Sequence, residues 1–158
     1  MELTKNKLQH IYGVSKKMQK MVSGNPEKFG MFFTPEAAFT LGFLHDIGYA
    51  FTESPMNHEH VGGTVLRTCG FNYAKEIYYH GDPDQKYYDS PELQPLQYCD
   101  MTINPFGEEV SMEQRVSDIK KRHGEESLQA TGAEKMRKRL LSLGFKDDGS
   151  GILYKNNK

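Results

Sequence analysis

The sequence lacks the features that mark disulfide-stapled, zinc-knuckle and membrane proteins. Its 158 residues include two cysteines, Cys69 and Cys99, and these form no CxxC pair. We therefore expect two buried free thiols and a reducing compartment. No apolar run approaches the ~20 residues that span a bilayer, and the opening MELTKNKLQ has no apolar stretch like that of a secretory signal. These absences predict a cytoplasmic protein that does not enter a membrane.

The sequence also lacks an excess of positive charge. Its 20 basic and 21 acidic residues give a formal net charge of −1. A protein that binds a nucleic-acid polymer usually has a basic excess or a basic stripe, so we expect no such partner. No linker or internal repeat divides the chain, and its length fits one domain. We place this domain at 1–144 and a polar, frayed tail at 145–158, from which Ile152, Leu153 and Tyr154 are candidates to dock back.

Signals for β-strands are nearly absent, whereas start and stop signals for helices recur along the chain. Helical spacing and caps predict helices at about 3–23, 34–48, 57–70, 72–80, 93–103 and 111–123, and a last one that ends at 144. Thr34 and Asn57 are expected N-caps, and Ser111 opens a capping box. The adjacent Gly62 and Gly63 suggest close backbone packing, because glycine is costly inside a helix. The sequence predicts an all-α fold, a compact bundle of about six or seven helices.

Histidine and aspartate side chains recur where the helical pattern predicts burial. His45 and Asp46 end an apolar helix, and Asp100 lies within another. These residue types are natural ligands of borderline divalent metals, and a catalytic site collects them from several elements. A buried carboxylate also needs a partner, because an isolated buried charge is costly. Taken alone, each has a plainer interpretation, such as a hydrogen-bonded histidine or a salt bridge from Asp100 to Arg115 or Arg122.

The order of these residues, together with their flanking glycines and apolar residues, resembles the HD-domain superfamily of metal-dependent phosphohydrolases. The resemblance is carried by His10, LHDIG at 44–48, HEHVGG at 58–63, IYYH at 77–80 and YCD at 98–100, and it continues through 110–124. It implies an all-α HD-type fold. It also implies one metal ion held by His10, His45, Asp46 and Asp100.

The resemblance further implies a second ion. In the branch that includes bacterial dinucleoside-tetraphosphate hydrolases, two intermediate histidines hold it, here His58 and His80, with Asp46 bridging both ions. The family pattern favours His58 over His60, and both cannot face one site because two helical positions differ by about 200°. We expect a cofactor of two divalent ions of iron, manganese, nickel, cobalt or zinc. The catalytic role falls to Asp46, His58 and His80.

Such a site indicates a metal-dependent phosphohydrolase whose partner is a small phosphorylated substrate, with nucleotides as first candidates. Two cations that share a carboxylate lower the pKa of a bridging water, so that hydroxide is available at neutral pH. They also neutralise the phosphoryl oxygens as the P–O bond breaks. Lys86, Arg67 and Arg115 are the candidates for binding the phosphate.

Two departures from the family pattern keep other functions open. Tyr49 stands where many members have lysine or arginine, and His80 is followed by GDPD in place of the hydroxyl and cationic residues of the tetraphosphate hydrolases. One alternative is a di-iron oxygenase that uses the same ligands to cleave a C–C or C–P bond. The other is a non-catalytic module that senses nucleotides.

Overall fold

The structure, a computed structural model, describes residues 3–29, 33–54 and 56–153. Within these ranges the protein is all-α, as the sequence predicts, and two isolated bridges are its only β contacts. Its elements are α1 (Lys5–Gly24), α2 (Pro26–Phe29), α3 (Pro35–Leu44), the 3-10 helix η2 (Ile47–Ala50), α4 (His58–Thr68), α5 (Ala74–Tyr79), α6 (Leu93–Met101), α7 (Met112–His123) and α8 (Leu128–Ser142). The short α2 and η2 were not expected. None of the helices in these ranges is long and apolar enough to cross a membrane.

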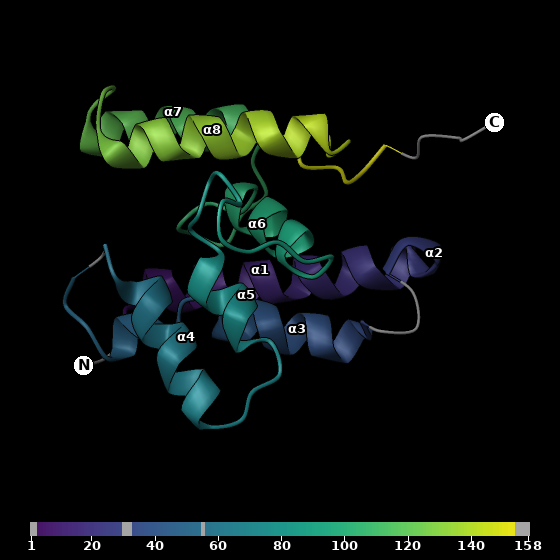
Figure 1. Cartoon of the computed structure of the whole chain (residues 1–158). Coiled ribbons are helices and arrows are strands. Elements are labelled where there is room, and N and C mark those ends of the chain that lie inside the picture. Colours follow the sequence, from purple (N-terminus) through teal and green to yellow (C-terminus); the bar gives the residue numbers. More distant parts are fainter. Residues whose placement is uncertain (1–2, 30–32, 55, 154–158) are drawn as a thin grey trace.

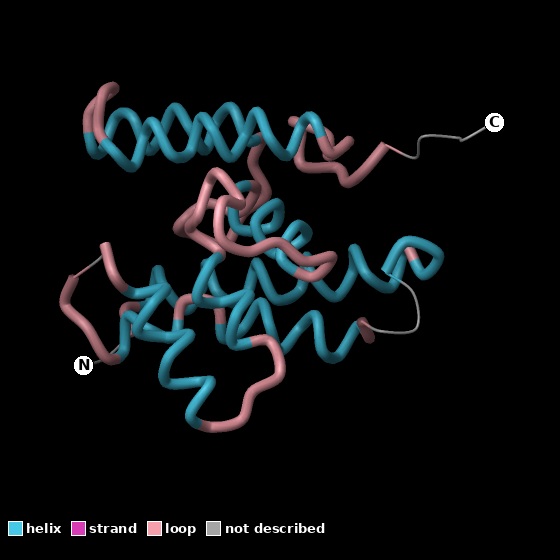
Figure 2. Tube along the Cα trace, viewed as in Figure 1, coloured by secondary structure: helices cyan, strands magenta, loops and turns pink. Residues whose placement is uncertain are grey.

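The helices form two outer pairs with α6 between them. Figure 1 shows α7 beside α8 along the top and α1 beside α3 below, with α4 and α5 next to the lower pair. Figure 2 shows loops at the ends of the outer helices and further loops beside α6 in the middle of the view. The sequence of α6 explains its central position, because Leu93, Leu96, Tyr98 and Cys99 on it are fully buried. Asp100 follows these apolar residues and is half-buried, with its side chain lining a cavity.

The helices begin at the predicted N-caps, but one helix ends earlier than predicted. The Thr34 hydroxyl accepts a hydrogen bond from the Ala37 amide at 3.1 Å, and the capping box of Ser111 is present in full. Asn57 occupies the N-cap position of α4 without a capping bond from its side chain. The helix expected to continue to residue 48 ends instead at Leu44, and the chain turns there into η2.

Close backbone contacts between glycines explain this early turn. A Cβ atom on Gly48 would overlap the carbonyl of His58 and lie 2.9 Å from the amide of Gly62. A Cβ atom on Gly63 would lie 2.5 Å from that of Tyr78, on α5. The predicted close packing at 62–63 is therefore confirmed. It fixes α4 against both η2 and α5, and so sets where His58 lies relative to Asp46.

The two cysteines have different environments. Cys99 is fully buried in α6, as predicted, and burial raises the pKa of its thiol to about 12. The prediction of a buried Cys69 is wrong, because this residue is exposed. It is the C-cap of α4, next to Gly70 with a φ of 76°, and this end of the helix faces solvent.

The segment after α8 packs back on the bundle. Phe145 is 1 % exposed and belongs to the core, and the carbonyl of Lys146 accepts a hydrogen bond from the Tyr98 hydroxyl at 2.8 Å. Of the residues expected to dock back, Ile152 packs against the core and Leu153 is 60 % exposed. Tyr154 and the rest of 154–158 lie outside the described residues. Residues 145–153 are thus part of the bundle, where a frayed tail was expected.

Candidate metal centre

The predicted metal ligands converge on one point inside the bundle. His10 comes from α1, His45 and Asp46 from the turn after α3, His58 from α4, His80 from the end of α5 and Asp100 from α6. Their ligand atoms form three overlapping groups in which all atoms lie within 4.8 Å of one another: His10, His45 and Asp46; His45, His80 and Asp100; and Asp46, His58 and His80. We call these residues the His/Asp cluster. All of these residues are buried except Asp100, which is half-buried, and nitrogen and oxygen donors at this spacing could hold a metal.

Each histidine is oriented by a bond from its other ring nitrogen. The Nδ1 atoms of His45 and His80 donate to the carbonyls of Gly42 and Ile77, both at 2.7 Å. These two bonds have the same local cause, because each histidine follows the last residue of a helix and turns back to the carbonyl three positions earlier. His10 donates from Nδ1 to the carbonyl of Asn104 at 3.1 Å. This arrangement fixes the tautomer and leaves Nε2 as the ligand atom.

His45 shows most directly that the cluster fits a cation. Its side chain is 0 % exposed, and no hydrogen bond reaches its Nε2 atom from the described residues. The closest carboxylate oxygens lie 3.6 and 3.7 Å away, on Asp46 and Asp100. A buried polar atom without a partner is costly and calls for an explanation. A metal ion between this nitrogen and the two carboxylates would supply the missing partner.

The two oxygens of Asp46 face different members of the cluster. Oδ2 lies 4.0 Å from Nε2 of His10, whereas Oδ1 lies 3.1 Å from Nε2 of His58 and 3.7 Å from Nε2 of His80. His58 is in turn held from Nδ1 by Glu59, with Oε2 at 3.3 Å. Oδ1 also lies 3.6 Å from Nε2 of His45, so the Asp46 carboxylate contacts all four histidines of the cluster.

The electrostatics of the cluster keep both aspartates ionised. Burial alone would raise the pKa of Asp46, but His45, His58 and His80 hold it well below its usual value. Burial likewise opposes ionisation of Asp100, but the 2.9 Å bond from Nε2 of His10 and the nearby His45 hold its pKa well below the usual value. His45 and Asp100 also lie at the C-terminal ends of α3 and α6, where the helix dipole is negative. The centre is therefore built to attract positive charge.

Two residues that were not predicted as part of the site, Lys7 and Tyr49, lie beside Asp46 and His58. The Lys7 ammonium lies 3.2 Å from Oδ2 of Asp46 and 3.6 Å from the centroid of the Tyr49 ring. The other face of Tyr49 stacks on His58 at 4.0 Å. The signal for Lys7 was its position three residues before His10, which places both side chains on one face of α1. From the sequence, Tyr49 stood out only because it replaces a basic residue of the family pattern. In the structure, the Lys7 ammonium lies against its ring.

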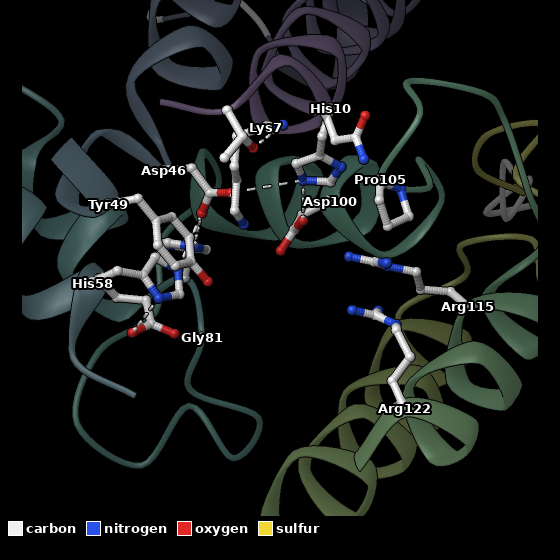
Figure 3. A pocket seen from close by; sticks show the side chains of 14 residues that line it. Lys7, His10, Asp46, Tyr49, His58, Gly81, Asp100, Pro105, Arg115 and Arg122 are labelled. Carbon is white, nitrogen blue, oxygen red and sulfur yellow. Dashed lines mark hydrogen bonds and ion pairs between the residues drawn. The ribbon is translucent and has the colours of Figure 1, made fainter. Parts of the chain in front are cut away.

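A cavity of about 290 Å³ opens beside the cluster, and two arginines face the cluster across it. Figure 3 shows Arg115 and Arg122 reaching from α7 toward the side that carries His10 and Asp100. Arg115 is 14 % exposed, and its Nε atom has no hydrogen-bond partner among the described residues. Asp118 lies 3.7 Å from Arg115 and 2.8 Å from Arg122. The alternative of a salt bridge from Asp100 is therefore not what the structure shows.

The other residues expected to bind phosphate lie elsewhere. Arg67 is exposed in the last turn of α4, about nine residues and ~13 Å along the helix from His58. Lys86 is exposed in the loop after α5, with its ammonium 5.3 Å from the Tyr87 ring. Neither lines the cavity beside the cluster. His60 stacks on Tyr78 at 4.3 Å and lies outside the cluster, so the structure brings in His58, as the sequence favoured.

No family model, curated protein or solved structure matches the chain.

Proposed function

We propose that this chain is a metal-dependent phosphohydrolase of the HD type. The observation that carries the proposal is the presence in one cavity of a His/Asp cluster and, opposite it, Arg115, whose Nε and Nη1 atoms make no hydrogen bond with the described residues. The first feature suits divalent cations, and the second suits a planar anion such as a phosphate. The ordered resemblance of the ligand residues to HD domains supports the same reaction class.

The residues divide into two ligand sets that share Asp46. His10, His45 and Asp100 would complete one set, and His58 and His80 the other. Bound cations would lower the pKa of a shared water and neutralise charge on the phosphoryl oxygens. Nitrogen and oxygen donors without thiolate suit iron, manganese, nickel, cobalt or zinc. Hydrolysis of a phosphate ester then takes one water, whose oxygen bonds to phosphorus while its protons go to the alcohol and phosphate products.

The chain's own part is to position the substrate. Arg115 donates hydrogen bonds to the phosphate from α7, and Arg122 adds positive charge two helical turns farther along the same face. Lys7 borders the same cavity from α1. These cations favour an anionic substrate and argue against the alternative of an oxygenase that acts on a neutral polyol. Oxygen uptake by the iron-loaded protein separates the two, because an oxygenase consumes oxygen and a phosphohydrolase does not.

Replacing Arg115 tests the phosphate-binding side. With manganese added, the wild-type protein should release phosphate from at least one substrate in a panel of nucleotides and phosphomonoesters. Arg115→Ala should raise the KM for that substrate by about 10- to 100-fold, because a hydrogen bond to a charged group contributes about 1.5–3 kcal/mol. Arg115→Lys should recover part of this loss, since an ammonium keeps the charge but not the two-pronged geometry.

Arg67→Ala is the matched control for this experiment, because it removes an arginine that lies outside the cavity. We expect its KM and kcat to equal those of the wild type. If Arg67→Ala and Arg115→Ala change KM equally, the phosphate does not bind at α7. If the metal-loaded wild type hydrolyses no phosphate ester, the reaction class is wrong, and binding of nucleotide without turnover would then favour a sensing module.

The two histidines of α4 form a second matched pair. His58→Ala should weaken the binding of one of the two ions by at least ~10-fold, which is the low end of the cost of losing even an outer partner of a metal site. His60→Ala should leave the metal content unchanged, because that ring stacks on Tyr78. Elemental analysis of both proteins after manganese loading and desalting measures the difference. Equal metal content in the two variants would contradict the role of His58.

A further inference from the structure

A second cavity lies away from the His/Asp cluster, between α1 and the turn at 149–151 that follows α8. It has a volume of about 420 Å³ and shares no lining residue with the cavity beside the cluster. Pockets of about 300–1,000 Å³ are typical of small-molecule sites. Lys17 lines it from α1, about two helical turns beyond His10, so the two cavities open at different points along one helix. We call it the Lys17 cavity.

The ammonium of Lys17 is buried without a hydrogen-bond partner among the described residues. Lys17 is 8 % exposed, and lysine is almost never buried unless it is paired. Its ion-pair partner, the Glu109 carboxylate, lies 3.6 Å away, beyond hydrogen-bonding distance, and the Glu109 side chain is 67 % exposed. The ring of Tyr98, with its centroid 5.3 Å from the ammonium, gives a cation–π contact but no hydrogen bond. Burial lowers the pKa of Lys17, and the charge of Glu109 offsets this only in part. Such a buried charge calls for an anionic partner.

The turn opposite Lys17 leaves room at the ammonium because it is built from glycine. Gly149 has a φ of 84°, and a Cβ atom there would lie 3.2 Å from Nζ of Lys17. Gly151, on the same turn, and Gly24, at the end of α1, also line the cavity, and a Cβ atom on either would meet nothing within 4 Å. Glycine also allows the close approach of a backbone to a ligand. These residues therefore keep the cavity open, and Gly149 keeps it open at the ammonium itself.

The turn is held in place by bonds that do not involve Lys17. The Gly151 amide donates to the Tyr98 hydroxyl at 3.0 Å, and the Ser150 amide donates to the exposed Asp148 carboxylate at 2.8 Å. The Tyr98 hydroxyl in turn donates to the carbonyl at 146. This wall of the cavity is therefore formed without a ligand. Hydrogen bonds to a ligand would come from the lysine side chains and not from these amides.

The charges that line the Lys17 cavity favour an anion. Lys20, three residues after Lys17 on α1, lines the same cavity, and Glu109 is the single acidic residue among the described residues that do so. Two ammonium groups thus face one carboxylate. The end of α1 has a partner of its own, because the Asn25 side chain donates to the Met21 carbonyl at 2.7 Å. The lysines are therefore available to a ligand, and the compact charge of an ammonium is a common binder of phosphate.

We propose that the Lys17 cavity is a phosphate-binding site, separate from the His/Asp cluster, for inorganic phosphate or a small phosphate monoester. Oxygen atoms of the phosphate would accept hydrogen bonds from the ammonium groups of Lys17 and Lys20. Because the lining carries a net positive charge, a dianion should bind more tightly than a monoanion of similar size. No hydrolysis is involved, so the proposal does not rest on the proposed function. The bound phosphate would link α1 to the turn after α8.

The test is an NMR titration of the full-length chain, without added metal, with inorganic phosphate. Acetate and chloride at the same ionic strength are the comparison anions. Phosphate should shift the backbone amide signals of 149–151, and it should bind more tightly than acetate, whereas chloride should cause no comparable shift. Arg115→Ala should leave these shifts unchanged, because Arg115 lines the other cavity. Glycerol 3-phosphate distinguishes the two sources, since tighter binding than that of phosphate identifies a monoester and weaker binding identifies the free ion.

Lys17→Met removes the ammonium and keeps an unbranched apolar stem. It should weaken phosphate binding by about 10- to 100-fold, the usual effect of losing a hydrogen bond to a charged group. Lys16→Met is the matched control, because Lys16 is the neighbouring lysine on α1 but is exposed and lies outside the cavity. It should bind phosphate as the wild type does. The NMR spectrum of each variant also shows whether it is folded.

Glu109→Gln tests the same contact without changing a buried residue. The Glu109 carboxylate competes with phosphate for Lys17, so its loss should tighten phosphate binding by about two- to fivefold, the scale of an exposed ion pair. The absence of shifts at 149–151 in the wild type, or equal binding by Lys17→Met and Lys16→Met, would overturn the proposal. Unchanged binding in Glu109→Gln would contradict the position at Lys17, and tighter binding of acetate than of phosphate would refute phosphate as the ligand.

Discussion

Asp46→Ala is expected to abolish metal binding and phosphate release together. Asp46 is the residue that both proposed ligand sets share, and its oxygens lie near His10, His45, His58 and His80. Loss of an outer partner of a metal site already costs about 10- to 100-fold in affinity or activity. Loss of a ligand that both ions share should weaken the binding of each ion by more than this factor. Elemental analysis after manganese loading, with phosphate release measured on the same samples, gives both quantities.

Asp46→Asn separates the charge from the shape of this side chain. The amide fills the same space but carries no negative charge, so we expect a folded protein with the same loss of metal. Asp89→Asn is the matched control, because Asp89 is exposed and does not line the cavity beside the cluster. It should keep the wild-type metal content and activity. Two ions per chain in Asp46→Asn would refute the bridging role, and activity without metal would refute the proposed reaction.

The sequence predicted most of the helices because their signals are local. Thr34 and Ser111 cap helices through bonds to amides three residues ahead, and the sequence alone displays such pairs. The end of α3 was misplaced for the opposite reason. Gly48 leaves the helix to meet the backbone of α4, and its own neighbours in sequence do not reveal which backbone approaches it.

The candidate site could be predicted in part for a related reason. Buried histidines and aspartates stand out in apolar helices, so the cluster was visible before its geometry was known. The arginines were harder to tell apart, because arginine is common on exposed helix faces, and Arg115 was predicted only together with Arg67 and Lys86. Arg67 and Arg115 are alike in sequence, and only the packing of α7 across the cavity from α1 distinguishes them.

Metal binding should raise the stability of the protein, and this is the second large effect that we expect. An ion present at 100 times its Kd stabilises the folded state by about 2.7 kcal/mol if it does not bind the unfolded chain. For a domain of this size, that corresponds to a rise in Tm of roughly 5–10 °C. Calorimetry of the protein with manganese and with a chelator measures this rise. Calcium is the control ion, because it prefers sites made entirely of oxygen ligands and should leave Tm unchanged.

The effect should depend on pH because protons and metal compete for the same nitrogen of His80. Burial opposes its protonation, but the bond to Asp46 and the charge of Glu59 raise the pKa of His80 to about 9. In the metal-free protein, this raised pKa contributes stability that is complete below pH ~6.5 and is lost as the pH rises through about 9. Asp46 and Asp100 have lowered pKa values, so their contribution is present above pH ~4 and is lost at lower pH.

Metal must displace the proton of His80, so its apparent affinity should rise with pH up to about 9. The difference in Tm between the manganese-loaded and the chelated protein should therefore be larger at pH 8.5 than at pH 6. Calorimetric titrations in two buffers of different ionisation enthalpy should show proton release on binding at pH 7. Asp46→Asn should show neither the rise in Tm nor the proton release. A rise in Tm that is the same at both pH values, without proton release, would mean that the metal binds away from His80.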